Sequence, residues 1–444
     1  MPLNKIIFFS FLYFLINTNY FNAKVRFVRV VFNSDASNSC SIIWDQVSGD
    51  FTSLKLYNAH SKSLSGQYEV YYIDGKRFNN YTSYTFENNS INPRVILRKK
   101  NFTVNRSNGL KNHVVRLCNI IKGKNSFEIV DSEGTSQRYY FSCVSNSPDD
   151  TLSFIAGGDS RSNRKTRQKA NLMVSKLKAN AVLFNGDFTA IDTPKQWEQW
   201  FEDWELSIAK DGRITPMVVT RGNHELSNKV MVDLFDVPHK RVYYSTEFGG
   251  NLLNIISLNS EILKIGRQKL FLRTTLKKHK NFHWQIPQYH RPIRPHVSFK
   301  REIETQYRNF IPLFEKYKNV RLCLENDSHT CKVTWPIVSS QGPNSSEGFE
   351  RNDQIGITYV GEGCWGAPLR KADDFKPWTR DAEAVNQFNW IFVSKEKIEV
   401  RTVLYENADE VEELSEETRF TIPTNLNLWS PKNGSLIEIY PQNK

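Results

Sequence analysis

Hydrophobic and polar positions divide the chain into two parts with different periods. Up to about residue 146, short runs rich in β-branched and aromatic residues alternate with Gly, Asn and Ser, and no helical period is present. The runs lie at residues 25–32, 41–44, 67–73, 114–120 and 137–143. This pattern predicts a β-sandwich of short strands, about 100 residues long or slightly more. A polar, proline-bearing linker follows at residues 145–150.

After the linker, strand and helix patterns alternate. Alternation at this spacing predicts βαβ units around a largely buried sheet. Strands are expected at residues 152–157, 181–185, 217–220, 252–258, 282–287, 320–324, 333–338, 355–360 and 389–393. Helices are expected at residues 165–178, 194–208, 268–279 and 302–317. The tail from residue 395 is β-like through Leu404 and should end in short strands near Phe420 and Leu436.

The first 23 residues have the pattern of an export signal. Lys5 supplies a positive charge, residues 6–16 are apolar except for Ser10, and Ala23 is a cleavage position. The apolar run is short for a membrane span, and an uncleaved membrane anchor is the alternative. We therefore expect a secreted, periplasmic or cell-surface protein, with no transmembrane domain after removal of the signal.

Composition narrows the class of protein. The 444 residues are 39% hydrophobic and 13% aromatic, enough for a sizeable core, and only one long apolar run is present. These values exclude wholesale disorder and a multispan membrane protein. Lys and Arg number 59 against 47 Asp and Glu, and the net charge of +12 favours anionic partners. Because the basic residues are scattered, no specific nucleic-acid partner is predicted.

Export would place the six cysteines in an oxidising compartment, where up to three disulfides are permitted. Cys118 with Cys143, and Cys323 with Cys331, are the candidate pairs. The alternative of buried thiols applies above all to Cys40 and Cys364.

Polar groups follow three successive strands of the second part. Asp159, Asp187 and Asn223 each come directly after a glycine at a strand end. Ligands of open α/β sheets bind at the carboxyl ends of the strands, so the three side chains should converge. Two later segments that follow strand-like runs add His290, and Asp327 with His329. Carboxylates, an amide oxygen and imidazoles form a ligand set for two metal ions that share a carboxylate.

The ordered series GD…GD…GNHE…H…DxH resembles the calcineurin-like metallophosphoesterases. It is most similar to the purple acid phosphatases, which also carry a fibronectin-III-like sandwich before the catalytic domain. Residues 113–117 and 137–141 resemble the last strands of that sandwich. The resemblance implies a four-layer α/β/β/α sandwich of the α/β class, preceded by an all-β fibronectin-III-like sandwich. The implied domains are a sandwich at residues 24–146, a catalytic domain at 151–394 and a C-terminal β extension packed on it at 395–444.

Carried over residue by residue, the resemblance implies two metal ions, iron, zinc or manganese. Asp187 would bridge both ions, and Asp159 and His329 would bind the first. Asn223 and His290 would bind the second, together with Asp327, which stands where the family usually has the first His of a Gly-His-x-His motif.

The resemblance also implies groups that act on the substrate. His224 would face the phosphate, and His296 would share that role or protonate the leaving group. Arg161 departs from the family pattern, and its role follows from its own chemistry: a guanidinium beside the site would grip the phosphate through its planar fork, the alternative being an ion pair with one of the clustered acids. For Arg221 a salt bridge at the sheet end is the preferred interpretation, and for Trp365 a structural turn is preferred over stacking on a leaving group.

The first metal site departs from the family pattern. The family's tyrosine ligand falls at Ala190, and the histidine that related phosphoesterases use falls at Arg161. Only Asp187, Asp159 and His329 remain there unless Asp192 or a water compensates, and no purple iron chromophore is expected.

These residues predict an exported dinuclear metal-dependent phosphatase. It would hydrolyse the phosphate monoester of a phosphorylated small molecule through a metal-activated hydroxide. The alternatives are a phosphodiesterase of the same fold and a non-catalytic surface binding protein with a degraded first metal site.

Overall fold

The computed structural model describes residues 23–49, 52–58, 68–72, 94–96, 111–118, 120 and 122–442. The predicted export signal lies outside these residues, except for Ala23. No helix in the described ranges is long and apolar enough to cross a membrane.

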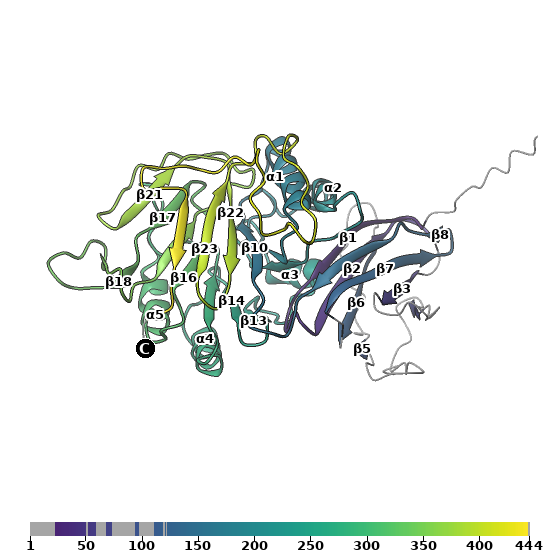
Figure 1. Cartoon of the computed structure of the whole chain (residues 1–444), viewed down its shortest axis with the longest axis horizontal. Helices are drawn as coiled ribbons and strands as arrows, with labels where there is room; N and C mark the ends of the chain where they lie inside the picture. Colours follow the sequence, from purple (N-terminus) through teal and green to yellow (C-terminus); the bar gives the residue numbers. More distant parts are fainter. Residues whose placement is uncertain are drawn as a thin grey trace, which may run out of the picture.

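Two large sheets form the body of the molecule (Figure 1). The ten-stranded sheet has the parallel strands β10, β11 and β12 near its middle. The antiparallel strands β22, β23 and β24 extend it on one side. Their bounds are Leu152–Gly157, Ala181–Phe184, Met217–Val219, Phe388–Val393, Ile398–Val403 and Leu436–Ile439.

The second sheet has seven strands in the order β13-β14-β15-β16-β20-β17-β21. The strands span, in that order, Tyr244–Phe248, Leu253–Ser257, Trp284–Gln288, Leu322–Glu325, Thr358–Gly361, Cys331–Thr334 and Thr379–Glu383. A two-stranded hairpin of β18 (Ile337–Ser339) and β19 (Phe349–Arg351) lies apart.

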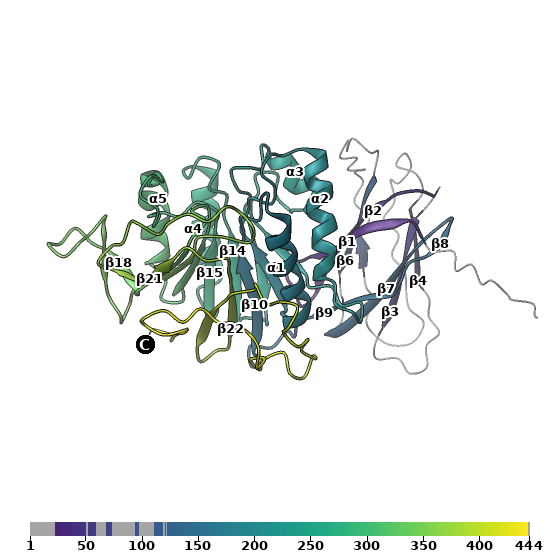
Figure 2. The same cartoon turned by 90° about the horizontal axis from the view of Figure 1, so that it is seen from above.

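Helices cover the outer faces. One hydrophobic core joins the two sheets and also includes apolar residues of α1 (Arg164–Leu177), α2 (Pro194–Trp204) and α3 (Asn228–Phe235). A second core packs α4 (Arg267–Lys278) and α5 (Glu304–Phe314) on the seven-stranded sheet. Figure 2 shows α4 and α5 together at one flank, away from α1 and α2. The predicted α/β class with its α/β/β/α layers is confirmed.

The N-terminal region is built of β-strands, as predicted, and lies at one end of the molecule (Figures 1 and 2). Its strands β1, β2, β6 and β5 continue the ten-stranded sheet, because β1 runs parallel to β12 with Val31 opposite Met217. They span Val25–Val31, Ser39–Gln46, Lys111–Cys118 and Arg94–Ile96.

A separate sheet completes this region. It contains β4 (Tyr68–Tyr72), β3 (Thr52–Asn58), β7 (Gly123–Asp131), β8 (Gly134–Thr135) and β9 (Tyr139–Cys143). The fibronectin-III likeness of the region and the division of the chain at residues 24–146, 151–394 and 395–444 stay predictions.

The structure differs from the predicted elements in several places. Strands β3, β7, β13 and β21 were not predicted. Residues 333–338 form parts of two strands, β17 and β18, instead of one. No strand lies near Phe420, where the described chain forms turns. Helix α3 was not predicted, because its eight residues are too few to show a helical period; Ser227 caps its first turn by accepting the Val230 N–H.

The candidate disulfides are wrong where the structure describes both cysteines. Cys323 and Cys331 are both buried and free, and they belong to the two different cores on opposite faces of the seven-stranded sheet. Cys143 is also free, and its Sγ donates to the Ala36 carbonyl at 3.3 Å. The structure does not describe the side chain of its candidate partner, Cys118.

Candidate metal centre

Loops at the carboxyl ends of strands from both sheets meet at one place. Asp159, Asp187 and Asn223 follow the adjacent parallel strands β10, β11 and β12. His290 follows β15, and Asp327 and His329 follow β16. The meeting point therefore draws on side chains from both sides of the interface between the sheets.

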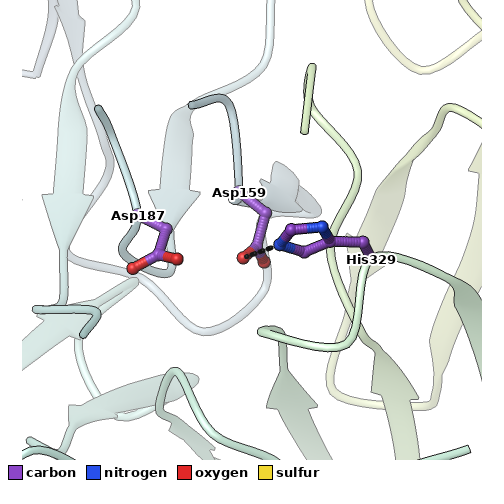
Figure 3. A group of neighbouring side chains, drawn as sticks. All are labelled: Asp159, Asp187 and His329. Carbon is purple, nitrogen blue, oxygen red and sulfur yellow. Dashed lines mark ion pairs between the residues drawn. The ribbon is translucent and has the colours of Figure 1, made fainter. Parts of the chain in front are cut away.

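Six of the nine predicted site residues contribute ligand-type atoms to this cluster. Two groups of residues have ligand atoms that all lie within 4.8 Å of one another: Asp159, Asp187 and His329, and Asp187, His290 and Asp327. Figure 3 shows the side chains of the first group turned toward one another. Asn223 joins the second group, since its Oδ1 lies 3.1 Å from His290 Nε2. Asp187 is common to both groups, the position of a bridging carboxylate.

Backbone carbonyls orient the three imidazoles of the site. Nδ1 of His290 lies 2.8 Å from the Asn185 oxygen, Nδ1 of His329 lies 2.9 Å from the Pro368 oxygen, and Nδ1 of His224 lies 2.6 Å from the Ala190 oxygen. A carbonyl oxygen only accepts, so each Nδ1 must carry the proton. Each Nε2 is then the nitrogen available to a metal ion or a substrate.

Two buried carboxylate oxygens of the cluster lack a hydrogen-bond partner. Asp159 Oδ1 and Asp187 Oδ2 are the atoms, and both side chains are almost completely buried. Buried polar atoms are almost always satisfied, so these two oxygens need a cation. Oxygen and imidazole donors around them fit a divalent metal ion.

Charge around His290 leads to the same conclusion for the second group. Its Nε2 lies 3.2 Å from Asp187 Oδ1 and 3.5 Å from Asp327 Oδ1. Burial opposes the charged imidazole, but the carboxylates of Asp187, Asp159 and Asp327 together outweigh it and hold the pKa of His290 well above its usual range. Burial likewise opposes ionisation of Asp187, yet His290 lowers the pKa of Asp187. These oxygens require a positive charge at their centre, and a metal ion supplies it without a proton.

The backbone of the ligand loops is strained. Asp159, Asp187, Asp327 and His329 have φ values of 57°, 54°, 73° and 58°. Non-glycine residues in this left-handed region cost about 1 kcal/mol or more each. Four such residues in one cluster indicate that ligand placement, not backbone preference, determines these loops.

Two glycines are required because ligand carboxylates lie against them. A Cβ on Gly222 would lie 2.2 Å from Asp187 Oδ1, and a Cβ on Gly363 would lie 2.2 Å from Asp159 Oδ2. The glycine-rich loop that contains Gly363 thus lies against the site. Trp365 of that loop is fully buried and donates its Nε1–H to Asn171, so it is structural.

Asp327 is paired with a lysine that sequence reasoning missed. Lys300 Nζ lies 2.7 Å from Asp327 Oδ2, while the other oxygen of Asp327 faces His290. The pair replaces the neutral imidazole expected from the family pattern without changing the net charge. Lys300 lies in a loop, and no motif in the sequence marks it.

At the first group, Arg161 contacts a ligand and no acid. Its Nη1 lies 3.3 Å from His329 Nε2, and no ion pair of Arg161 is present among the described residues. The alternative of an ion pair with a clustered acid is therefore not seen. Asp192 does not replace the missing ligand, since its oxygens accept from Trp197 Nε1 and the Leu226 N–H.

His296 and Arg221 lie outside the cluster. His296 is completely buried, and its Nε2 lies 2.7 Å from Thr379 Oγ1. Burial also lowers the pKa of His296, so it is poorly placed to protonate a leaving group. Arg221 donates to the Glu225 carbonyl and to Asn228 Oδ1. The salt bridge with an acid that the sequence favoured for Arg221 is not present among the described residues.

Glu225, the last residue of the GNHE motif, was given no role from the sequence, yet its carboxylate holds the ligand loops in place. It is fully buried and accepts the N–H groups of Asp187, Phe188 and Gly222 at 2.7–3.0 Å. It therefore fixes the turns that deliver Asp187 and Asn223. Burial and the nearby Asp187 raise the pKa of Glu225 to about 8.

Comparison with known protein families identifies the domain. A calcineurin-like phosphoesterase family model matches residues 156–330, the range that contains all six ligand-type residues. The chain carries a calcineurin-like phosphoesterase domain. Its catalytic class is that of the metal-dependent phosphoric ester hydrolases, as the resemblance implied. A comparison with curated protein sequences finds no match.

Solved structures share the phosphoesterase fold over most of the chain. A purple acid phosphatase from yellow lupin (Lupinus luteus) seeds is 12% identical, with a TM-score of 0.66 over 87% of this chain and 73% of that one. The structure of PhoD is 9% identical, with a TM-score of 0.64 over 95% of this chain and 94% of that one. At these identities the similarity is one of fold.

Proposed function

We propose that the protein is an exported phosphatase that hydrolyses phosphate monoesters with two metal ions. The observation that supports this most is the sharing of Asp187 by two groups of ligand-type side chains. Two ions held by these residues would supply an activated water as nucleophile and neutralise charge on the phosphate. Asp159 and His329 would hold the first ion, and Asn223, His290 and Asp327 the second.

The residues of the chain then have separable roles. His224 is the exposed imidazole of the site, with 26% of its side chain accessible and Nε2 3.7 Å from Asp187 Oδ2. It is positioned to donate from Nε2 to a phosphate oxygen when protonated there. Arg161 would release His329 Nε2 to the metal and turn its guanidinium to the phosphate. With Ala190 in place of tyrosine, an iron-loaded protein should lack an intense visible band.

The test is hydrolysis by the purified protein supplied separately with Mn, Zn and Fe. We expect p-nitrophenyl phosphate to be hydrolysed faster than bis(p-nitrophenyl) phosphate, with two metal ions bound per chain. A preference for the diester would favour the phosphodiesterase. Absence of bound metal and of turnover would favour a binding protein, in which Arg161 and Lys300 keep the ligand atoms they now contact.

A further inference from the structure

A large cavity lies at the opposite end of β16 and β20 from the metal centre. It has a volume of about 790 Å³. Its lining includes Arg321, which directly precedes β16, and Thr358, the first residue of β20. The carboxyl ends of the same strands lead to Asp327 and Gly363. One strand length, about 13 Å, separates the two sites, so the cavity is not part of the phosphoesterase centre. Its volume is that of a small-molecule site.

Arg321 in this cavity is a buried cation without a partner. Only 6% of the residue is exposed, and its Nε and Nη1 are buried and make no hydrogen bond. No acidic side chain forms an ion pair with it in the described part of the chain, and burial alone lowers its pKa. A buried unpaired charge is costly, and such groups normally have a partner.

The other arginines of the cavity are already paired. Arg351 donates to both oxygens of Asp353 and stacks on Trp335 at 3.7 Å. Arg380 donates to Asp381 and to the backbone near Gly434. Lys318 is exposed at the rim. The guanidinium available to a ligand is therefore that of Arg321, with Lys318 adding a second positive charge.

Part of the cavity wall is apolar and exposed, and polar and charged side chains, Asp353 and Glu438 among them, make up the rest. Ile355, Leu436 and Tyr440 are 53%, 37% and 54% exposed, and all three line it. Strand β24 is the yellow strand near the C-terminus in Figure 1. The segment that follows it closes one wall of the cavity, because the Gln442 side chain donates a hydrogen bond to the Ile355 carbonyl. The cavity therefore offers a ligand two kinds of contact: apolar contact with the exposed side chains and charge pairing with the buried Arg321 guanidinium.

We propose that this cavity binds a small amphipathic molecule whose single anionic head, a carboxylate or a phosphate, pairs with Arg321. The guanidinium fork matches the oxygens of either head group. The apolar body of the ligand covers Ile355, Leu436 and Tyr440. This site is separate from the proposed phosphatase function and does not depend on it.

The test measures binding of octanoate, octylphosphonate, octanol and inorganic phosphate to the metal-loaded protein by calorimetry. We expect one of the two anionic amphiphiles to bind, and which one binds identifies the head group. Arg321→Met should weaken this binding at least tenfold, whereas Arg273→Met, which removes one exposed charge on α4, should not. Equal binding of octanol would overturn the role of the charge, and phosphate binding as tightly as octylphosphonate would overturn the role of the apolar wall.

Two further measurements keep the proposal falsifiable. Without ligand, Arg321→Met should melt at the same temperature as the wild type or higher, because it removes an uncompensated buried charge. If it melts several degrees lower and the amphiphiles do not bind the wild type, Arg321 is structural and the proposal fails. Ile355→Glu alters an exposed side chain, so it should fold and repel the anionic head, weakening binding at least tenfold. Metal content and hydrolysis of p-nitrophenyl phosphate should be unchanged in both variants.

Discussion

At the scale of single residues, Asp187 is the residue on which both proposed metal positions depend. It belongs to both ligand groups, and its Oδ1 also accepts the His224 N–H at 2.9 Å. Asp187→Ala should therefore abolish turnover and remove metal from both positions. Metal content by mass spectrometry and steady-state kinetics measure this. Asp149→Ala, which removes an exposed carboxylate paired with Lys395, is the control and should behave as wild type. A variant at 187 that kept two ions and its rate would disprove the dinuclear centre.

Arg161 provides the second residue-scale prediction. If its guanidinium contacts the phosphate, Arg161→Lys loses a charge-assisted fork worth about 1.5–3 kcal/mol. We expect kcat/KM to fall roughly 10–100-fold while metal content and melting temperature stay near wild type. Arg221→Lys is the matched control, because that guanidinium is bound to Glu225 O and Asn228. Unchanged kinetics in a stable, metal-loaded Arg161→Lys protein would remove Arg161 from the site.

Asp159, Asp187 and Asn223 could be predicted because each follows a strand within a Gly-Asp or Gly-Asn pair. His290, Asp327 and His329 could be predicted because they follow later strand-like runs. Lys300 could not, since it lies 27 positions from Asp327 in the sequence and belongs to no motif. His296 lies outside the cluster, and its role in the reaction stays a prediction. Its spacing from His290 says nothing of the turn that buries it against Thr379.

At the scale of elements, α2 supports the first ligand loop. Trp200 of this helix donates its Nε1–H to Ser160 Oγ at 2.9 Å, and that hydroxyl donates to the Phe188 carbonyl at 2.8 Å. The bond joins the residue after Asp159 to the residue after Asp187. The tryptophans of α2 are buried in the core, and the structure shows that one of them is linked to the ligand loops.

Replacing Trp200 tests this support. Trp200→Phe removes the hydrogen bond and some volume, which should lower stability by about 1–3 kcal/mol. It should also weaken metal binding, because the loops of Asp159 and Asp187 lose their link. Trp204→Phe is the control: Trp204 stacks on Trp200 but makes no bond to these loops. Denaturant unfolding and metal titration should show stability loss in both variants and weaker metal binding only in Trp200→Phe.

The long helices were predictable from their periods, whereas the short helix α3 and several strands, including the nine-residue β7, were not. Helices α1, α4 and α5 and the strands before the ligands lie within a few residues of their expected ranges. Helix α3 has eight residues, and the residues near Phe420 form turns although their composition favours strands. In both places tertiary contacts outweigh local propensity.

At the scale of the whole molecule, Glu247 joins three parts of the chain. Its backbone bonds to Ser34 and Ala36 of the N-terminal region, and its side chain meets His279 at 2.8 Å and Lys278 at 2.7 Å at the end of α4. The hydrogen bond from His279, aided by Lys278, lowers the pKa of Glu247 to about 2. The ionised carboxylate therefore stabilises the fold at neutral pH.

This pairing predicts a pH dependence of stability. A depressed carboxyl pKa contributes stability above the unfolded value of about 4.3, and the contribution disappears as the pH falls toward 2. Glu247→Gln should lower the free energy of unfolding by about 1 kcal/mol at pH 7, after allowance for solvent screening of a partly exposed group. The difference from wild type should vanish near pH 2. Glu410→Gln, an exposed glutamate without an ion pair in the described ranges, should show no such convergence in denaturant melts.

The shared ten-stranded sheet limits how the protein can be shortened. A chain that began after the polar linker would leave the backbone of β12 without its neighbour β1. Its N–H and C=O groups, and the apolar side chains that β1 now covers, would form an open edge on which other strands add. Such a fragment would self-associate through that edge even with every metal ligand present. The N-terminal strands thus protect the edge of the catalytic sheet from pairing with other chains.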